Sequence, residues 1–233
     1  YTPDGKCRVT LTPEWAAILH PLYKHTKQHK SKLFQKLNAG TYAQELYALM
    51  CRYQDGASIS STKKTTVKLA NHWATPPEVY AALQSLTKAT KERFASPLNY
   101  NPRMQQYWSI HRKDQVFGAK WNTYKHQWTG CSVHNPEYED SEPNKNLATA
   151  IAAAQATDSP VLGVHILPAW TDRNRTSYMN WLSHHPENCK HVLQIPRKHF
   201  RFQRPTTWEI GEQYAGHPKW DVNIIITGNT LHV

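Results

Sequence analysis

The stretch "NKNLATAIAAAQATDSPVLGVHIL", residues 144–167, changes from a helical pattern to a strand pattern within a short distance. Alanine and other good helix formers fill its first half, which predicts a helix over Asn144–Ala156. After the turn-forming letters TDSP, the apolar and β-branched run Val161–Leu167 predicts a strand. A helix that leads directly into an apolar strand is typical of an α/β sheet.

Further segments on both sides repeat this alternation. Apolar runs at His191–Ile195 and Val222–Thr227 predict two more strands, and Asn174–His184 predicts another helix. The letters TPPE at residues 75–78 are a typical helix start, and this helix is expected to run through about Thr87. Strands and helices that alternate at this length predict the α/β fold class.

The N-terminal part has a helical pattern instead. The letters TPE at residues 12–14 are a good helix start, and apolar residues follow at helical spacing from Trp15 to Tyr23. A second apolar stripe runs from Tyr42 to Tyr53, and the polar stretch 55–68 then indicates a boundary. We therefore expect two parts, a helical, basic region at residues 1–70 and an α/β domain at residues 71–233.

The composition favours a nucleic-acid partner. The 233 residues carry a net charge of +11 and include 9 Trp and 12 Tyr. Lysines and arginines neutralise phosphates, and aromatic rings stack on unpaired bases. A positive charge also suits a solvated surface, so a basic run such as residues 24–36 fits either a phosphate-contacting face or an ordinary one.

Several common kinds of site are missing from the sequence. Neither GxxxxGK[ST] nor GxGxxG occurs, which argues against nucleoside triphosphatases and ordinary dinucleotide enzymes. No HExxH or CxxC occurs either, and HHPENCKH at residues 184–191 fits a surface loop better than a zinc site. The four scattered cysteines are typical of reduced thiols in an intracellular protein. No apolar run is long enough to span a membrane.

The letters HNPEY, residues 134–138, follow a short strand-like run. Asn-Pro followed by an acid is a common turn, so these letters alone fit an ordinary loop as well as a site. The letters also resemble the Asn-Pro-Pro-aromatic turn with which some enzymes hold an exocyclic amine for methyl transfer. In such a site, the Asn135 side-chain oxygen and the Pro136 carbonyl would accept the two N–H protons of an exocyclic adenine amine. The amine nitrogen would then be oriented for attack on the methyl group of S-adenosylmethionine, with Tyr138 stacked on the base.

The order of the motifs resembles that of a known family. TPPEVY at 75–80, ERFASPLN at 92–99, DQVFG at 114–118 and HNPEY follow one another as in the phosphorylated-CTD-interacting-factor family of adenosine N6-methyltransferases. FASPLN is identical to that family's signature, and NPEY stands where the family has Asn-Pro-Pro-Phe. The order is also similar to that of phage-type DNA adenine methyltransferases. LPAW, KHVLQIP and NIIITGN extend the resemblance to about residue 229.

The resemblance implies a Rossmann-like S-adenosylmethionine-dependent methyltransferase sheet with an N-terminal helical extension. The implied reaction is methylation of adenine N6 in nucleic acid, with RNA, next to the cap, as the first expectation and DNA as the second. The implied catalytic residues are Asn135, Pro136, Glu137 and Tyr138. The cofactor S-adenosyl-L-methionine would be bound by Glu92, Phe94, Ala95, Ser96, Pro97, Asn99, Asp114, Gly118 and Asn229, the last of which would close the pocket.

Glu137 departs from the family pattern. A second proline would stiffen the turn that aims the two acceptors, whereas glutamate lacks that restraint and adds a negative charge. The alternative interpretation is therefore a catalytically inactive methyltransferase-like subunit that binds nucleic acid or a protein partner.

The remaining expectations concern partners and location. Candidate phosphate contacts, for each of which a solvated role is also open, are Arg103, Arg112, Lys113, Lys120, Lys125, Arg173 and Arg175. No metal site and no membrane contact are expected. The family resemblance favours the nucleus over the cytoplasm.

Overall fold

The fold is known from a computed structural model of the 233-residue chain. The structure describes residues 13–58, 74–139, 141–170, 176–203 and 217–229. Two of the predicted nucleic-acid contacts, Arg173 and Arg175, lie outside these residues, as does the boundary expected near residue 70.

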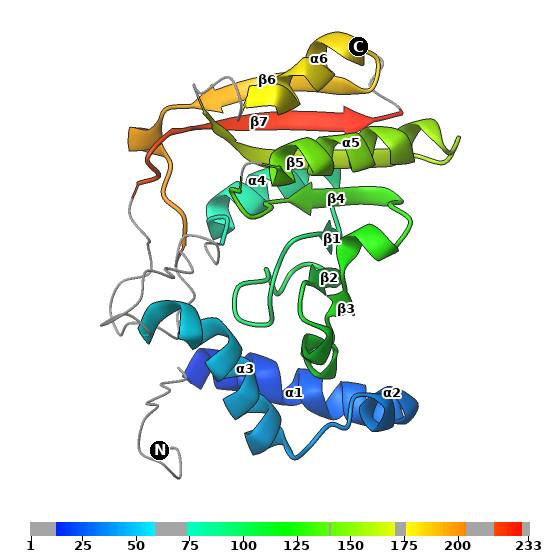
Figure 1. Cartoon of the computed structure of the whole chain (residues 1–233), viewed down its shortest axis with the longest axis vertical. Coiled ribbons are helices and arrows are strands. Elements are labelled where there is room, and N and C mark those ends of the chain that lie inside the picture. The colour runs from blue at the N-terminus through cyan, green and yellow to red at the C-terminus, as the bar shows by residue number, and fades with distance from the viewer. Residues whose placement is uncertain (1–12, 59–73, 140, 171–175, 204–216, 230–233) are drawn as a thin grey trace.

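A seven-stranded sheet forms the centre of the described part (Figure 1). Its strands are β1 Lys91–Glu92, β2 Gln106–Ser109, β3 Lys120–Trp121, β4 Gly130–His134, β5 Val161–Ala169, β6 Cys189–Ile195 and β7 Asp221–Gly228. The spatial order is β3-β2-β1-β4-β5-β7-β6, and β7 runs antiparallel to both of its neighbours. The neighbouring strands from β3 to β5 are parallel. The predicted α/β class is therefore confirmed.

The strand order reverses at β1. From β1 the chain passes outward to β2 and β3, and then returns to place β4 on the other side of β1. The loops that follow β1 and β4 therefore diverge at the carboxyl edge of the sheet. A crevice at such a switch point is where open α/β sheets bind ligands.

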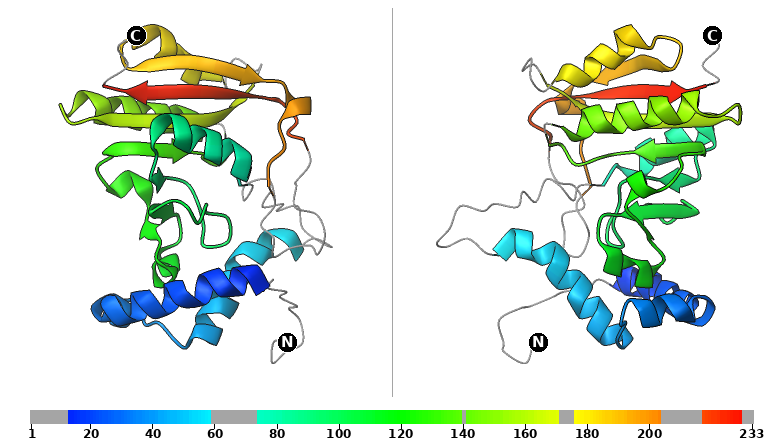
Figure 2. Two further views of the ribbon diagram at one scale, coloured as in Figure 1. Left: turned by 180° about the vertical axis from the view of Figure 1, so that it is seen from behind. Right: turned by 45° about the vertical axis from the view of Figure 1, so that its right-hand side comes forward.

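Helices α4 (Pro77–Thr87) and α5 (Glu142–Gln155) cover opposite faces of the sheet, as the two views in Figure 2 show. Tyr80 of α4 packs in one core cluster with Val133 and Val164. Leu147 of α5 packs in another cluster with Ile225. Both helices were predicted within two residues of their ends. The predicted helix at 174–184 is found as a 3-10 turn, Thr176–Met179, followed by α6, Asn180–His184.

Three N-terminal helices share a core with the outer part of the sheet. These helices are α1 (Pro13–His29), α2 (Ser31–Lys36) and α3 (Tyr42–Ser58). Leu19 of α1 and Met50 of α3 lie in one buried cluster with Leu98, Tyr107 and Phe117. The helical region predicted from the sequence is thus packed directly against the elements that follow β1.

Candidate functional site

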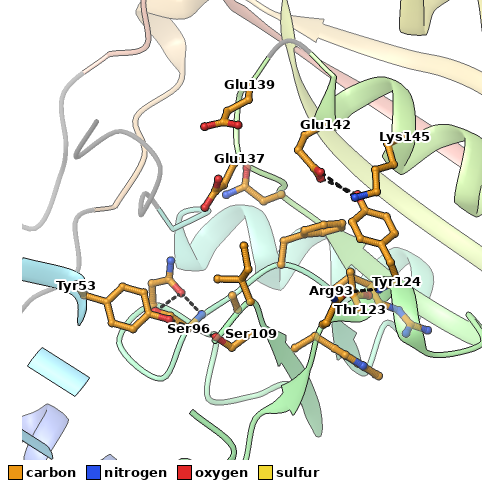
Figure 3. Close-up of a pocket in the computed structure, with 17 residues that line it drawn as sticks. Tyr53, Arg93, Ser96, Ser109, Thr123, Tyr124, Glu137, Glu139, Glu142 and Lys145 are labelled. Atoms are coloured by element: carbon orange, nitrogen blue, oxygen red, sulfur yellow. Dashed lines mark hydrogen bonds and ion pairs between the residues drawn. The ribbon is translucent and has the colours of Figure 1, made fainter. Parts of the chain in front are cut away.

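A cavity of about 260 Å³ lies at the carboxyl edge of β1, β2 and β4 (Figure 3). It is lined by Tyr53 of α3, the loop after β1, the end of β2, the segment after β3, the loop after β4 and the first turn of α5. The lining residues are Tyr53, Arg93, Phe94, Ala95, Ser96, Asn99, Trp108, Ser109, Ile110, Asn122, Thr123, Tyr124, Asn135, Glu137, Glu139, Glu142 and Lys145. Six of them were predicted from the sequence, namely Phe94, Ala95, Ser96, Asn99, Asn135 and Glu137.

Hydrogen bonds within the loop after β1 fix its shape. The Ser96 backbone N–H and hydroxyl both donate to Asn99 Oδ1, at 2.6 and 2.9 Å. The Leu98 N–H in turn donates to Ser96 Oγ at 3.2 Å. Pro97 lies in this loop but not among the cavity-lining residues. The residues of FASPLN therefore form a closed local turn. Ser96 and Asn99 of this turn line the cavity.

The loop after β4 divides its residues between the cavity and the core. Asn135 and Glu137 line the cavity, whereas Pro136 is buried. Tyr138 does not line the cavity. Its hydroxyl donates to the Ile166 carbonyl at 3.2 Å, and its ring centre lies 5.8 Å from that of Phe202. Tyr138 thus lies outside the cavity lining in this structure, and its expected stacking on a base remains a prediction.

One side of the cavity is acidic. Figure 3 shows Glu137 and Glu139 close together above Tyr53, Ser96 and Ser109. Burial raises the pKa of Glu137, and the nearby charges of Glu139 and Glu142 raise it further. The Glu142 carboxylate accepts a 2.7 Å hydrogen bond from the Tyr124 hydroxyl and forms a 3.3 Å ion pair with Lys145.

Glu92 lies behind the loop after β1 rather than in the cavity. Its buried carboxyl group accepts hydrogen bonds from the Tyr80 hydroxyl and, at 2.8 Å, from the Asn101 N–H. Burial raises the pKa of Glu92 to about 7, although the two hydrogen bonds act against this shift. In this structure Glu92 ties α4 to both ends of the loop, and its expected contact with the cofactor remains a prediction.

Asp114 also stands behind the cavity wall. Its buried carboxylate accepts hydrogen bonds of 2.6 Å from Arg52 Nη2, the Tyr53 hydroxyl and the Ser109 hydroxyl. Because Tyr53 and Ser109 line the cavity, Asp114 positions two of its wall residues. Gly118 ends the 3-10 helix Arg112–Phe117 with a positive φ of 89° and lies against α1, outside the cavity.

Asn229 lies at the opposite edge of the sheet. Its side-chain oxygen accepts a 3.0 Å hydrogen bond from the N–H of Val161, the first residue of β5, and its amide donates to the Thr157 carbonyl at 2.6 Å. Because β7 is antiparallel, its last residues reach the amino end of β5. The expectation that Asn229 closes the pocket is therefore corrected.

Most of the predicted phosphate contacts lie near the outer strands. Lys113 Nζ donates to the Asn38 carbonyl at 3.1 Å, and Lys120 Nζ donates to Gln106 Oε1 at 2.8 Å. The charged ends of Arg112 and Lys125 lie over the Trp121 ring, at 5.6 and 4.0 Å from its centre, and Arg103 is exposed. None of these five lysines and arginines lines the cavity.

Eleven wall residues were not predicted from the sequence. Arg93 had a local signal, since it lies within ERFASPLN and directly precedes FASPLN. Tyr53 is brought in by the packing of α3, and residues 122–124 by the crossover after β3; no motif marks either segment. The first turn of α5 adds Glu142 and Lys145, which follow HNPEY closely enough that proximity alone was a usable signal.

No group of three or more His, Cys, Asp or Glu side chains in the described residues is arranged to hold a metal ion. No helix within the described ranges is long and apolar enough to cross a membrane.

One comparison with known proteins finds a relationship. A family model described as "Phosphorylated CTD interacting factor 1 WW domain" matches residues 18–202. The matched range begins within α1 and ends after β6, so it contains every residue that lines the cavity. No curated protein matches the chain. The family resemblance predicted from the motif order is confirmed by the family match.

Proposed function

The chain belongs to the phosphorylated CTD interacting factor 1 WW domain family, and from this membership we propose that it is a S-adenosylmethionine-dependent methyltransferase. Its proposed acceptor is N6 of adenine in nucleic acid. RNA, at the position next to the cap, is the first choice and DNA the second. The mixed sheet with its switch point at β1 and β4 suits the Rossmann-like fold that this reading requires.

One observation carries the proposal. The FASPLN loop after β1 and the NPEY turn after β4 are far apart in sequence, yet Ser96, Asn99 and Asn135 line the same cavity. A methyl transfer needs a cofactor loop and an amine-orienting turn within reach of one another. If HNPEY were an ordinary turn, there would be no reason for it to line the same cavity as the FASPLN loop.

The wall offers groups that fit the proposed cofactor. Its size, about 260 Å³, is near the lower end of the roughly 300–1,000 Å³ typical of ligand pockets. Arg93, Trp108 and Thr123 present buried donor groups that have no hydrogen-bond partner among the described residues. Phe94 and Tyr124 add aromatic surface, with ring centres 5.7 Å apart. When bound, S-adenosylmethionine supplies an electrophilic methyl group on a sulfonium ion.

The protein groups at the turn would orient the acceptor. An adenine amine is a weak nucleophile because its lone pair is delocalised into the ring. The side-chain oxygen of Asn135, a lining residue, would accept one of its N–H groups, and the carbonyl of Pro136, which is buried beside the lining, would accept the other. These bonds would orient the nitrogen and stabilise the positive charge that develops on it. The Glu137 carboxyl group lines the same cavity, where burial and the charges of Glu139 and Glu142 raise its pKa.

Location and partners follow from the family. The family description names an interaction with a phosphorylated CTD, and we propose a protein partner of that kind in the nucleus. The net charge of +11 supports a nucleic-acid substrate, because lysines and arginines near the outer strands would neutralise its phosphates.

A second candidate is an inactive member that binds nucleic acid or a protein partner. The observation that favours it is Glu137, which stands in the cavity where the family has a second proline and lies near two further carboxylates. Their shared negative charge would disfavour an approaching phosphate, and the turn lacks the restraint of a second proline.

Calorimetry with S-adenosylmethionine tests the proposal. We expect binding by the unmodified chain and a loss of about tenfold or more in Asn99→Ala, because Asn99 Oδ1 holds the Ser96 N–H and hydroxyl in place. Asn101→Ala, next to the cavity but outside its lining, is the matched control. No heat of binding, together with retained affinity for oligonucleotides, would favour the inactive candidate.

A further inference from the structure

Three buried donor side chains gather in one wall of the cavity. Arg93, Trp108 and Thr123 are only 1%, 3% and 5% exposed, and all three line the cavity. Arg93 Nε and Nη1, Trp108 Nε1 and Thr123 Oγ1 have no hydrogen-bond partner among the described residues. Buried donors are almost always paired, since leaving one unpaired is destabilising. Their gathering in one wall indicates that a ligand supplies the acceptors.

The neighbouring strands hold these groups in place before any ligand binds. The Arg93 N–H, just beyond β1, donates to the Val133 carbonyl of β4 at 3.0 Å. The Arg93 guanidinium carbon lies 4.2 Å from the centre of the Trp108 ring and 5.3 Å from that of Trp128. Contact with aromatic rings restrains a planar guanidinium and leaves its N–H groups able to donate in the plane.

The charge around this wall is positive. Lys120 Nζ lies 4.8 Å from the centre of the Trp108 ring, and Lys91, the first residue of β1, lies two residues before Arg93 in the chain. Burial lowers the pKa of Arg93 to about 10, so the guanidinium stays protonated at neutral pH. Within the described ranges, no carboxylate forms an ion pair with Lys91, Arg93 or Lys120.

We propose that Arg93, Trp108 and Thr123 bind an oxyanion carried by the small molecule that occupies the cavity. A guanidinium offers two parallel N–H groups to a carboxylate or phosphate, and the indole N–H and the hydroxyl add neutral donors. The burial of all three side chains favours the end of a small ligand over the backbone phosphate of a polymer.

The identity of this ligand rests on the proposed function. For a methyltransferase, the oxyanion is the α-carboxylate of S-adenosylmethionine. The terminal phosphate of a nucleotide has the same chemistry and is the other source. Trp108 and Thr123 lie outside the family motifs, and Arg93, within ERFASPLN, has no role in what the resemblance implies.

Two variants test the subsite with a matched pair of ligands. Arg93→Met removes the donors but keeps an unbranched side chain over Trp108, and Thr123→Val removes the hydroxyl at nearly equal volume. S-adenosylmethionine is compared with 5′-methylthioadenosine, which keeps the adenosine and the sulfur but lacks the carboxylate. We expect Arg93→Met to lower the affinity for S-adenosylmethionine by about tenfold or more. Thr123→Val should lower the same affinity by about two- to tenfold. The affinity for 5′-methylthioadenosine should change by less than about twofold. Arg201→Met, at an exposed site outside the cavity, is the control.

Each of the other possible results bears on the oxyanion assignment. Equal losses for both ligands, or no loss for either, would overturn the oxyanion assignment. Adenosine 5′-monophosphate, which carries a phosphate instead of the carboxylate, is the third ligand. A loss of affinity confined to this nucleotide would assign the subsite to phosphate. If the unmodified chain binds no S-adenosylmethionine, the proposed function fails, and inorganic phosphate then tests the subsite alone. Phosphate should raise the Tm of the unmodified chain but not that of Arg93→Met or Thr123→Val; an equal rise or no rise would overturn the inference.

Discussion

The hydroxyl of Tyr53 on α3 donates a 2.6 Å hydrogen bond to Oδ2 of Asp114, which follows β2. The same carboxylate accepts a hydrogen bond of equal length from Arg52, the neighbour of Tyr53. The N-terminal helices are thereby joined to the wall of the cavity through a buried polar contact as well as through the shared apolar core. The helical region is for this reason part of the candidate site.

Tyr53→Phe should destabilise the fold by about 2 kcal/mol, because it removes a buried hydrogen bond to a carboxylate. Tyr42→Phe on the same helix is the matched control. The Tyr42 hydroxyl is buried with no hydrogen-bond partner among the described residues, so its removal should be neutral or slightly stabilising. Urea unfolding measures both. Equal effects of the two substitutions would show that the Tyr53–Asp114 contact does not join the two parts.

A second buried network joins the sheet to α5. His134 Nε2 lies 2.8 Å from Ser132 Oγ, and His165 Nε2 lies 2.8 Å from Thr227 Oγ1. Asn146 of α5 bonds the other nitrogen of both rings. Burial lowers the pKa of His134 well below its usual value and that of His165 to about 3, and the pair disfavours a charge on His134 further. Both rings are thus neutral and fully bonded in the folded protein.

Stability should fall when the pH drops below about 6.5. Between the unfolded pKa near 6.5 and the folded value near 3, the unfolded chain binds a proton on His165 that the folded chain does not, so stability rises with pH by about 1.4 kcal/mol per unit. Glu92, with its folded pKa raised to about 7, acts in the opposite direction between about 4.5 and 7. Between pH 4.5 and 6.5, the slope of the unfolding free energy against pH should be smaller in His165→Gln than in the unmodified chain, by the equivalent of about one bound proton. The exposed His199→Gln serves as the reference, and an unchanged slope in His165→Gln would contradict the neutral network.

Gly163→Ala should break this network sterically. A Cβ atom at residue 163 would lie 2.7 Å from both His165 Nε2 and Thr227 Oγ1, which are held inside the core. Overpacking of this kind costs about 1–3 kcal/mol. At Gly40, the added Cβ would meet the flexible end of Gln44, so Gly40→Ala should cost much less. Thermal unfolding of the two variants compares them, and equal Tm values would contradict the tight packing around residue 163.

Glu137→Pro should raise the rate of methyl transfer about two- to fivefold. Proline would restrict the turn that aims Asn135 and the Pro136 carbonyl, and a restraint of this kind is worth about 0.4–1 kcal/mol. Glu137→Gln separates the restraint from the charge, because it removes the carboxylate without stiffening the backbone. Initial rates under saturating cofactor measure the effect. A higher rate in Glu137→Gln than in Glu137→Pro would show that charge, not backbone freedom, limits the turn.

The sequence predicted the regular parts of this fold and missed the short ones. The runs that form β5, β6 and β7 are long, apolar and bounded by turns, so these strands could be predicted from the sequence. Strands β1 and β3 have two residues each, and nothing in Lys91–Glu92 or Lys120–Trp121 has the alternation of a strand. These two strands form because they pair with the strands beside them in the sheet, and this pairing depends on the tertiary structure.

The same division holds for the cavity. The FASPLN and HNPEY motifs predicted Ser96, Asn99 and Asn135, which line the cavity, because the order of these motifs is that of a known family. Asn229 was placed wrongly, since the motif cannot show that β7 runs antiparallel. Nor can the motif show that the Tyr138 hydroxyl bonds to the Ile166 carbonyl. Arg93 and Thr123 were missed because unpaired donors become visible only once burial and partners are known.

The proposed reaction is tested most directly by methyl transfer from labelled S-adenosylmethionine to adenine-containing oligonucleotides, with the modified base identified after digestion. We predict N6-methyladenine with the unmodified chain and at least a hundredfold lower rate with Asn135→Ala, because the amine would lose an acceptor that is engaged most strongly in the transition state. Capped RNA, uncapped RNA and single-stranded DNA distinguish the substrates. No transfer to any of them, or an equal rate in Asn135→Ala, would contradict the proposal that this cavity is a methyl-transfer site.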